Sequence, residues 1–170
     1  MYDVTYHRAA SVDDAAAKFS AASDGQLLAG GQTLLPTMKH RLAAPSDLID
    51  LRGIADLVGV KVSGRKVTIG AMTTHAAVAE NAELAKVCPA IAKLAGGIGD
   101  PAVRHQGTIG GSIANNDPAA DYPAGLLALA ATIHTNRREI AADDFFTGLF
   151  STALDEGEII TAVSFEAPEA

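Results

Sequence analysis

The chain has 170 residues, 48% of them hydrophobic and 19% charged, which suits one folded domain and excludes wholesale disorder. Thirteen Lys and Arg against twenty Asp and Glu give a formal net charge of −7, which argues against a nucleic-acid or anionic-membrane surface, because both need a basic face. The single cysteine, Cys88, excludes an internal disulfide and any zinc knuckle or four-thiolate iron–sulfur site built by this chain alone.

The N-terminal residues 1–7 have neither the basic start nor the apolar core of a secretory signal. The longest mostly apolar run, Pro123 to Ile133, is shorter than the ~20 residues that a spanning helix needs. We therefore expect a cytoplasmic protein with no transmembrane segment. The histidines are scattered without metal-ligand spacing, so no metal site is expected, and His75 is interpreted as an ordinary first-turn helix residue.

The first part of the chain alternates strand and helix patterns. Ser11 followed by Asp13 and Asp14 is typical of an N-cap and an acidic first turn. The alternation β-α-β-α-β predicts parallel strands joined by crossover helices. The expected elements are a strand at 4–6, a helix at 15–22, a strand at 26–29, a helix at 34–42 and a strand at 47–51.

The second part begins with period-two alternation across Ser63-Gly64-Arg65, which indicates a hairpin. Thr73 and Thr74 are expected to cap a helix, and Pro89 to interrupt a longer one. These patterns predict two lobes, 1–55 and 56–170, that meet near residues 51–59. The expected elements are strands at 60–62 and 66–69, helices at 74–80 and 84–94, a loop at 96–101, a helix at 119–130, and strands at 132–135, 139–140 and 158–165.

Two glycine pairs carry the candidate chemistry. Gly30-Gly31 lie at a strand–turn–helix junction, where glycine lets a ligand approach the backbone and the helix start offers unpaired N–H groups to phosphate. Gly110-Gly111 lie between Thr108 and Ser112, whose hydroxyls can bond phosphate or ribityl oxygens. Neither segment has the spacing of a P-loop or of G-x-G-x-x-G, so each alone could be only a tight turn.

Together, the two turns fit a ligand with a central pyrophosphate better than either does alone, and we expect them to converge on one diphosphate through main-chain amides. The residues 115–121 that follow are expected to form an Asx-type turn and the N-cap of the next helix. No acid–base pair is evident, which favours a chain that holds a reactive cofactor.

The segments 29–36 and 104–121 resemble the medium, FAD-binding subunit of molybdenum hydroxylases, a family that includes the carbon monoxide dehydrogenase medium chain and the flavin subunits of xanthine dehydrogenases. The resemblance implies a two-lobed α+β FAD-binding domain of the vanillyl-alcohol-oxidase (PCMH) type, with FAD between the lobes. It also implies an oxidoreductase subunit that relays electrons from the iron–sulfur clusters of a small subunit through FAD to an external acceptor. The resemblance further implies that the substrate is oxidised in a molybdopterin-containing large subunit.

By matching position, the resemblance also implies the cofactor-binding residues. The two turns wrap the cofactor, Ile98 lies against the isoalloxazine, Asp121 makes a polar contact and Ile160 a backbone contact. Gln32 stands where many relatives have His. The implied contact residues are Ala29, Gly30, Gly31, Gln32, Thr33, Leu34, Ile98, Thr108, Ile109, Gly110, Gly111, Ser112, Asp121 and Ile160.

Members of this family continue into a C-terminal domain that helps to cover the flavin, and we expect this chain, which stops at Ala170, to lack it. Two alternatives remain: a self-sufficient flavin oxidase on the same fold, and a scaffold or assembly module that has lost the cofactor. The sequence predicts that replacing both Gly110 and Gly111 with valine abolishes flavin retention while leaving the fold nearly intact.

Overall fold

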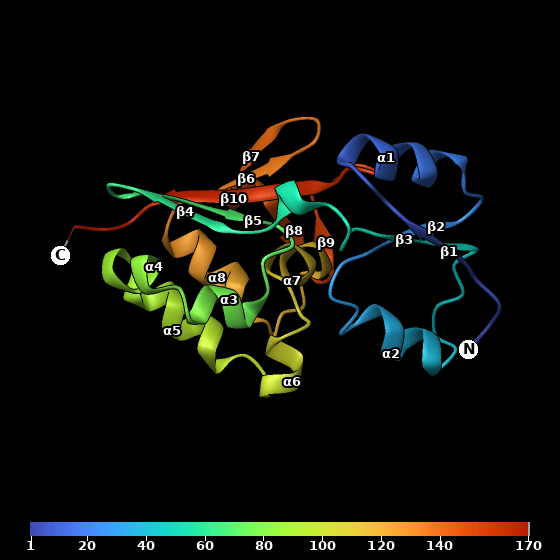
Figure 1. Ribbon diagram of the computed structural model, residues 1–170, viewed down its shortest axis with the longest axis horizontal. Helices are drawn as coiled ribbons and strands as arrows, with labels where there is room; N and C mark the ends of the chain where they lie inside the picture. Colours follow the sequence, from blue (N-terminus) through green and yellow to red (C-terminus); the bar gives the residue numbers. More distant parts are fainter. Residues whose placement is uncertain (170) are drawn as a thin grey trace.

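Two sheets organise the chain in the computed structural model, which describes residues 1–169 (Figure 1). The smaller, N-terminal sheet has three parallel strands in the order β1-β3-β2, with α1 and α2 on opposite faces. Ser11 caps α1 by accepting from the Asp14 N–H at 3.1 Å. The β-α-β-α-β prediction is therefore confirmed. Its elements are β1 (Thr5–Arg8), α1 (Val12–Ala21), β2 (Gly25–Leu28), α2 (Leu34–Lys39) and β3 (Asp47–Asp50).

The larger lobe is an antiparallel sheet in the order β4-β5-β10-β6-β7, with α3, α4, α5 and α8 against one face (Figure 1). The last strand in the chain, β10, lies in the middle of this sheet, so the sheet is complete only once the C-terminal residues are in place. The elements are η1 (Ala55–Leu57), β4 (Val60–Ser63), β5 (Lys66–Gly70), α3 (His75–Ala79), α4 (Ala82–Val87), α5 (Pro89–Gly97), α6 (Pro101–Arg104), α7 (Ile109–Asn115), α8 (Asp121–Ala128), β6 (Thr132–Thr135), β7 (Glu139–Ala141), α9 (Ala142–Phe145), β8 (Phe146–Gly148), β9 (Ser151–Thr152) and β10 (Ile160–Glu166).

The two lobes share packing. One buried cluster combines Ile49 of the small sheet with Leu57, Met72 and Ile159 of the larger lobe. The Met72 N–H donates to the Leu57 carbonyl at 2.8 Å, which ties the connection between the lobes to the segment that follows β5. Because buried apolar side chains join the lobes, the space between them has a defined shape.

Several local predictions are confirmed and others are wrong. The hairpin β4–β5 forms, and Pro89 opens a new helix at its first position. The expected loop at 96–101 is wrong at both ends, because α5 runs through Gly97 and α6 begins at Pro101. The segment around Gly110, treated as a turn, is the helix α7, and the helix expected at 119–130 is the shorter α8. The sequence patterns did not reveal η1, α6, α9, β8 and β9.

Asn116 holds the hairpin β8–β9 against the end of α7. Its backbone is left-handed (φ +44°), and its side-chain amide donates to the carbonyls of Gly148 and Ser151, each at 2.8 Å. We expect Asn116→Ala to lower the free energy of unfolding by about 2–3 kcal/mol, since it removes two buried hydrogen bonds and leaves alanine in the left-handed region. Urea denaturation measures this.

The matched control is Asn115→Ala, because the Asn115 side chain makes no hydrogen bond within residues 1–169. We expect it to change the free energy of unfolding by less than about 0.5 kcal/mol. Equal effects of the two substitutions would show that the amide of Asn116 does not secure the hairpin.

Candidate functional site

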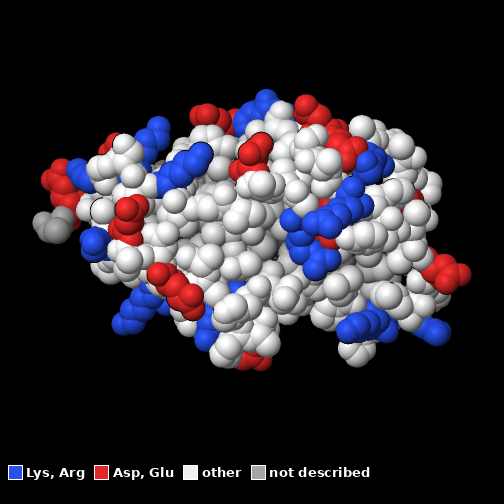
Figure 2. Space-filling view, viewed as in Figure 1, with Lys and Arg blue, Asp and Glu red and all other residues white. Residues whose placement is uncertain are grey.

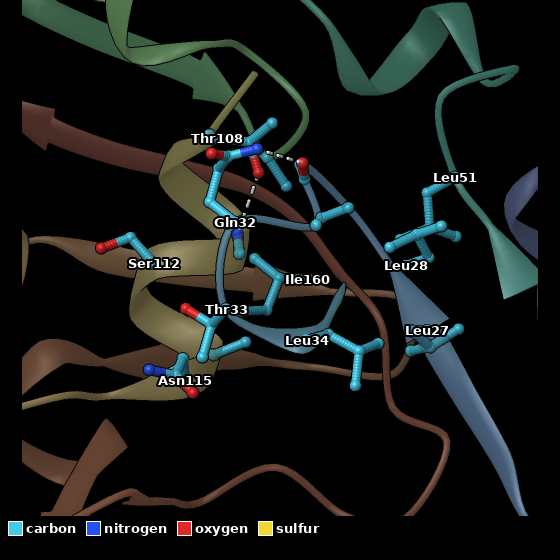
Figure 3. A pocket seen from close by; sticks show the side chains of 18 of the residues that line it. Leu27, Leu28, Gln32, Thr33, Leu34, Leu51, Thr108, Ser112, Asn115 and Ile160 are labelled. Carbon is cyan, nitrogen blue, oxygen red and sulfur yellow. Dashed lines mark hydrogen bonds between the residues drawn. The ribbon is translucent and has the colours of Figure 1, made fainter. Parts of the chain in front are cut away.

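A cavity of about 820 Å³ lies between the two lobes, within the size range of pockets for small molecules and cofactors. Its walls come from the end of β2 and the following turn, the segment before α3, the loop before α6, the first turns of α7, and the chain leading into β10. Figure 3 shows the turn with Gln32, Thr33 and Leu34 beside α7, which carries Ser112 and Asn115. Segments from both halves of the sequence thus form one cleft.

The first glycine turn provides main-chain donors. No hydrogen bond within the described residues uses the backbone N–H groups of residues 30–34. Gly31 has φ +72°, a conformation that favours glycine, and Thr33 makes no side-chain cap at the start of α2. Successive free N–H groups in such a turn make a concave site for an anion. The expected donor set is therefore present at this turn.

The second glycine pair offers a different kind of surface. The Ile109 N–H donates to the Thr73 carbonyl at 3.1 Å, Gly110 to Ala71 at 2.8 Å, and Gly111 to the Thr108 hydroxyl at 3.1 Å. These amides are already bonded, so the expectation of main-chain donors is not met here. The side chains of Thr108, Ser112 and Asn115 line the cavity instead and can bond hydroxyl or phosphate oxygens.

At Gly30, the first glycine turn meets the segment that leads into α7. A β-carbon built on Gly30 would overlap the carbonyl oxygen of Gln106 and lie 2.7 Å from Cα of Gly107. A β-carbon on Gly110 would lie 2.7 Å from the Ala71 carbonyl oxygen, on the side of the core. The double valine replacement is therefore expected to disturb the fold itself, which corrects the expectation that it would test the site alone.

Most of the predicted contact residues share this cleft. All of them line it except Ile109 and Asp121. Ile109 is fully buried in the core, and Asp121 is an exposed residue at the start of α8. Asp117 does line the cleft, and its carboxylate accepts from the Ala119 N–H at 2.9 Å, which is the Asx turn expected there.

Two buried titratable side chains that were not predicted also line the cleft. His75 is buried in the first turn of α3, and burial lowers its pKa to about 4, so the imidazole is neutral at pH 7. Glu158 is buried before β10, and the hydrogen bond from Arg138 lowers its pKa to about 2. The Thr-Thr-His sequence signalled the helix start at His75, but the approach of Gly107 to its ring depends on the tertiary fold.

Other candidates lie elsewhere. Cys88 is buried in the core of the larger lobe. Residues 1–169 contain no group of three or more His, Cys, Asp or Glu side chains placed to hold a metal ion, and no helix among them is long and apolar enough to cross a membrane. On the face in Figure 2, basic and acidic side chains are interspersed rather than separated.

Comparisons with known proteins agree with one another. Residues 2–168 match the family described as "FAD binding domain in molybdopterin dehydrogenase". The chain is 43% identical to the carbon monoxide dehydrogenase medium chain of Afipia carboxidovorans (96% of this chain, 58% of that one) and 40% identical to the nicotine 6-hydroxylase medium subunit of Paenarthrobacter nicotinovorans (94% and 58%).

The solved carbon monoxide dehydrogenase of Hydrogenophaga pseudoflava that lacks the Mo-pyranopterin moiety superimposes with a TM-score of 0.95 at 39% identity. That match covers 99% of this chain and 61% of the other. The chain thus spans about three fifths of the length of the relatives it matches.

Proposed function

Because the chain belongs to the family of FAD-binding domains in molybdopterin dehydrogenases, we propose that it serves as the FAD-binding electron-transfer subunit of a molybdenum-containing hydroxylase or dehydrogenase. The resemblance predicted from the two glycine pairs is confirmed, as are the α+β fold and FAD as the cofactor. The oxidoreductase class is the class of the relatives and is proposed for this chain. The electron relay, the partner subunits and the cytoplasmic location are proposals.

The cleft between the lobes carries this proposal. The run of unbonded N–H groups in residues 30–34 suits a pyrophosphate, because main-chain donors hold anions without needing a basic surface. Across the cleft, the hydroxyls of Thr108 and Ser112 suit ribityl and phosphate oxygens. These donors fit FAD in kind and number.

The remaining predicted contacts retain their proposed roles. Ile98 lines the cleft and offers an apolar surface to the isoalloxazine ring. Asp121 directly follows Ala119 and Ala120, which line the cleft, so a ligand as long as FAD can reach its carboxylate beyond them. We also retain the division into lobes at residues 55 and 56.

When bound, FAD supplies the electron-transfer chemistry, because it can accept two electrons and release them singly or in pairs. The role of this chain is to bind the cofactor, orient it and exclude water from its buried side. Relatives named as medium chains or medium subunits support an assembly in which a molybdopterin-containing large subunit and an iron–sulfur small subunit supply the electrons. NAD, oxygen, a quinone or another acceptor would remove them.

Titration of the flavin-free chain with FAD, followed by absorbance and by quenching of flavin fluorescence, tests the binding step. We expect one FAD per chain, released unmodified on denaturation, and binding of riboflavin weaker by on the order of 100-fold, since riboflavin lacks the pyrophosphate. A chain that ignores FAD would indicate the scaffold alternative, and a covalently attached flavin would indicate the self-sufficient oxidase. Co-purification with molybdopterin and iron–sulfur subunits from the source organism tests the assembly.

A further inference from the structure

Two buried polar atoms lack a hydrogen-bond partner within residues 1–169: Nδ1 of His75 and the hydroxyl of Tyr122. Tyr122 is 0% exposed and His75 4%. Their rings are neighbours, with centroids 5.4 Å apart and planes tilted by 43°. A buried polar atom with no partner loses its bonds to water without replacement, so two such atoms on adjacent rings call for a physical explanation.

The two atoms are chemically complementary. Burial lowers the pKa of His75 to about 4 and raises that of Tyr122 well above its ordinary value, so at pH 7 the imidazole is neutral and the phenol keeps its proton. A neutral imidazole has one nitrogen that accepts a hydrogen bond and one that donates, and a phenol can donate to the first. The structure shows no direct hydrogen bond between the two atoms, so one water molecule that bridges the hydroxyl and Nδ1 would satisfy both.

The side chain of His75 lines the cleft, and its other nitrogen, Nε2, makes no hydrogen bond within the described residues. A β-carbon on Gly107 would lie only 2.6 Å from Nε2, and the His75 N–H donates to the Gly107 carbonyl at 3.0 Å. The ring is therefore packed against the turn that leads into Thr108 and Ser112.

We propose that one water molecule bridges the Tyr122 hydroxyl and Nδ1 of His75, accepting from the phenol and donating to Nδ1, and so holds the tautomer whose Nε2–H is offered to an oxygen of the bound cofactor. The identity of the ligand rests on the proposed function. His75 is then a cofactor-contacting residue, and Tyr122 is a positioning residue that acts through it. The acceptor is a pyrophosphate or ribityl oxygen near Gly107.

Nitrogen-15 NMR of the histidines in the flavin-free chain tests the tautomer, with the His75 signals assigned from a His75→Gln variant. We expect the wild-type ring to be protonated at Nε2, with Nδ1 in the shift range of a hydrogen-bonded acceptor. In Tyr122→Phe we expect a mixture of tautomers, a lower free energy of unfolding, and FAD affinity weaker by about five- to tenfold. Tyr2→Phe is the matched control, because Tyr2 is exposed and its hydroxyl has no partner within residues 1–169.

The proposal is overturned if wild-type His75 is protonated at Nδ1, or if Tyr122→Phe is more stable than wild type and binds FAD equally well, as expected when the hydroxyl truly lacks a partner. The wild-type spectrum shows the tautomer even if the variant fails to fold. Because this spectrum is recorded without flavin, it also shows the tautomer if the chain binds no FAD. Failure of this proposal and failure of the proposed function are therefore distinguishable.

Affinities of His75→Phe for FAD, ADP and riboflavin then identify the acceptor. A loss shared by FAD and ADP assigns it to the pyrophosphate, and a loss shared by FAD and riboflavin assigns it to the ribityl chain. Unchanged affinity for all three ligands would contradict a contact from Nε2.

Discussion

Gly30→Ala is expected to weaken FAD binding by on the order of 100-fold, the equivalent of losing about two charge-assisted hydrogen bonds. The added β-carbon would overlap the Gln106 carbonyl oxygen and lie 2.7 Å from Cα of Gly107. Backbone atoms cannot rotate away as a flexible side chain can, and the Gln106 N–H is bonded to the Val103 carbonyl at 3.1 Å. Residues 30–34 must therefore move, which misaligns their N–H donors. Equilibrium titration with FAD measures the loss.

The control for this substitution is Gly97→Ala at the end of α5. Gly97 has no atom within 4 Å of its would-be β-carbon, so the same chemical change meets no obstacle. We expect wild-type FAD affinity for Gly97→Ala, and a free energy of unfolding about 1–3 kcal/mol lower for Gly30→Ala, as for other overpacked sites. Unaltered FAD affinity in Gly30→Ala would contradict the placement of the phosphate site at this turn.

Arg138→Met is expected to lower the free energy of unfolding at pH 7, because it leaves the buried carboxylate of Glu158 without its cation. Arg138 donates to Glu158 through Nε at 3.0 Å and through a terminal nitrogen at 2.9 Å. Thr135 at 2.7 Å and the Asp155 N–H at 2.8 Å complete the set. Arg138 is half-exposed, so solvent screening keeps the effect below that of a fully buried pair.

The same pair predicts a pH dependence. The pKa of Glu158 is about 2 in the folded chain against an ordinary value of 4.5, so between these pH values the unfolded chain binds more protons. The contribution of Glu158 to stability is complete above about pH 4.5 and is lost as the pH falls towards 2. Urea unfolding at pH 3, 4, 5 and 7 should show this slope in the wild type and a smaller one in Arg138→Met.

Arg137→Met is the comparison for Arg138, because Arg137 reaches only exposed groups, with Asp155 at 3.9 Å. We expect it to cost less than about 1 kcal/mol. If the two substitutions had equal costs, or if the pH slope were the same in Arg138→Met and the wild type, Glu158 would not depend on Arg138 for its charge.

The sequence predicted those features whose signals are local. The strand–turn–helix junction at Gly30 and Gly31, the parallel alternation of the small lobe and the hairpin β4–β5 all follow from residues adjacent in the chain. The convergence of the two glycine pairs was inferred from what a diphosphate requires, and the close approach of Gly30 to Gly107 agrees with it.

The features that the sequence patterns did not reveal depend on distant residues. Two adjacent glycines disfavour a helix, yet α7 forms because Thr108 caps it and the carbonyls of Ala71 and Thr73 accept its first N–H groups. The same bonds remove these amides from the donor set of the cleft. The burial of Nδ1 of His75 depends likewise on Tyr122, which is far along the chain.

We expect the free N–H groups of residues 30–34 to be the ones that bind the diphosphate. Proton–nitrogen NMR of the backbone amides, recorded as FAD and then ADP are added to the labelled chain, tests this directly. We predict that both ligands shift the amides of residues 30–34 most, while those of Ile109 and Gly110, which are bonded internally, move less. Shifts centred on another surface, such as the open face of the five-stranded sheet, would contradict it.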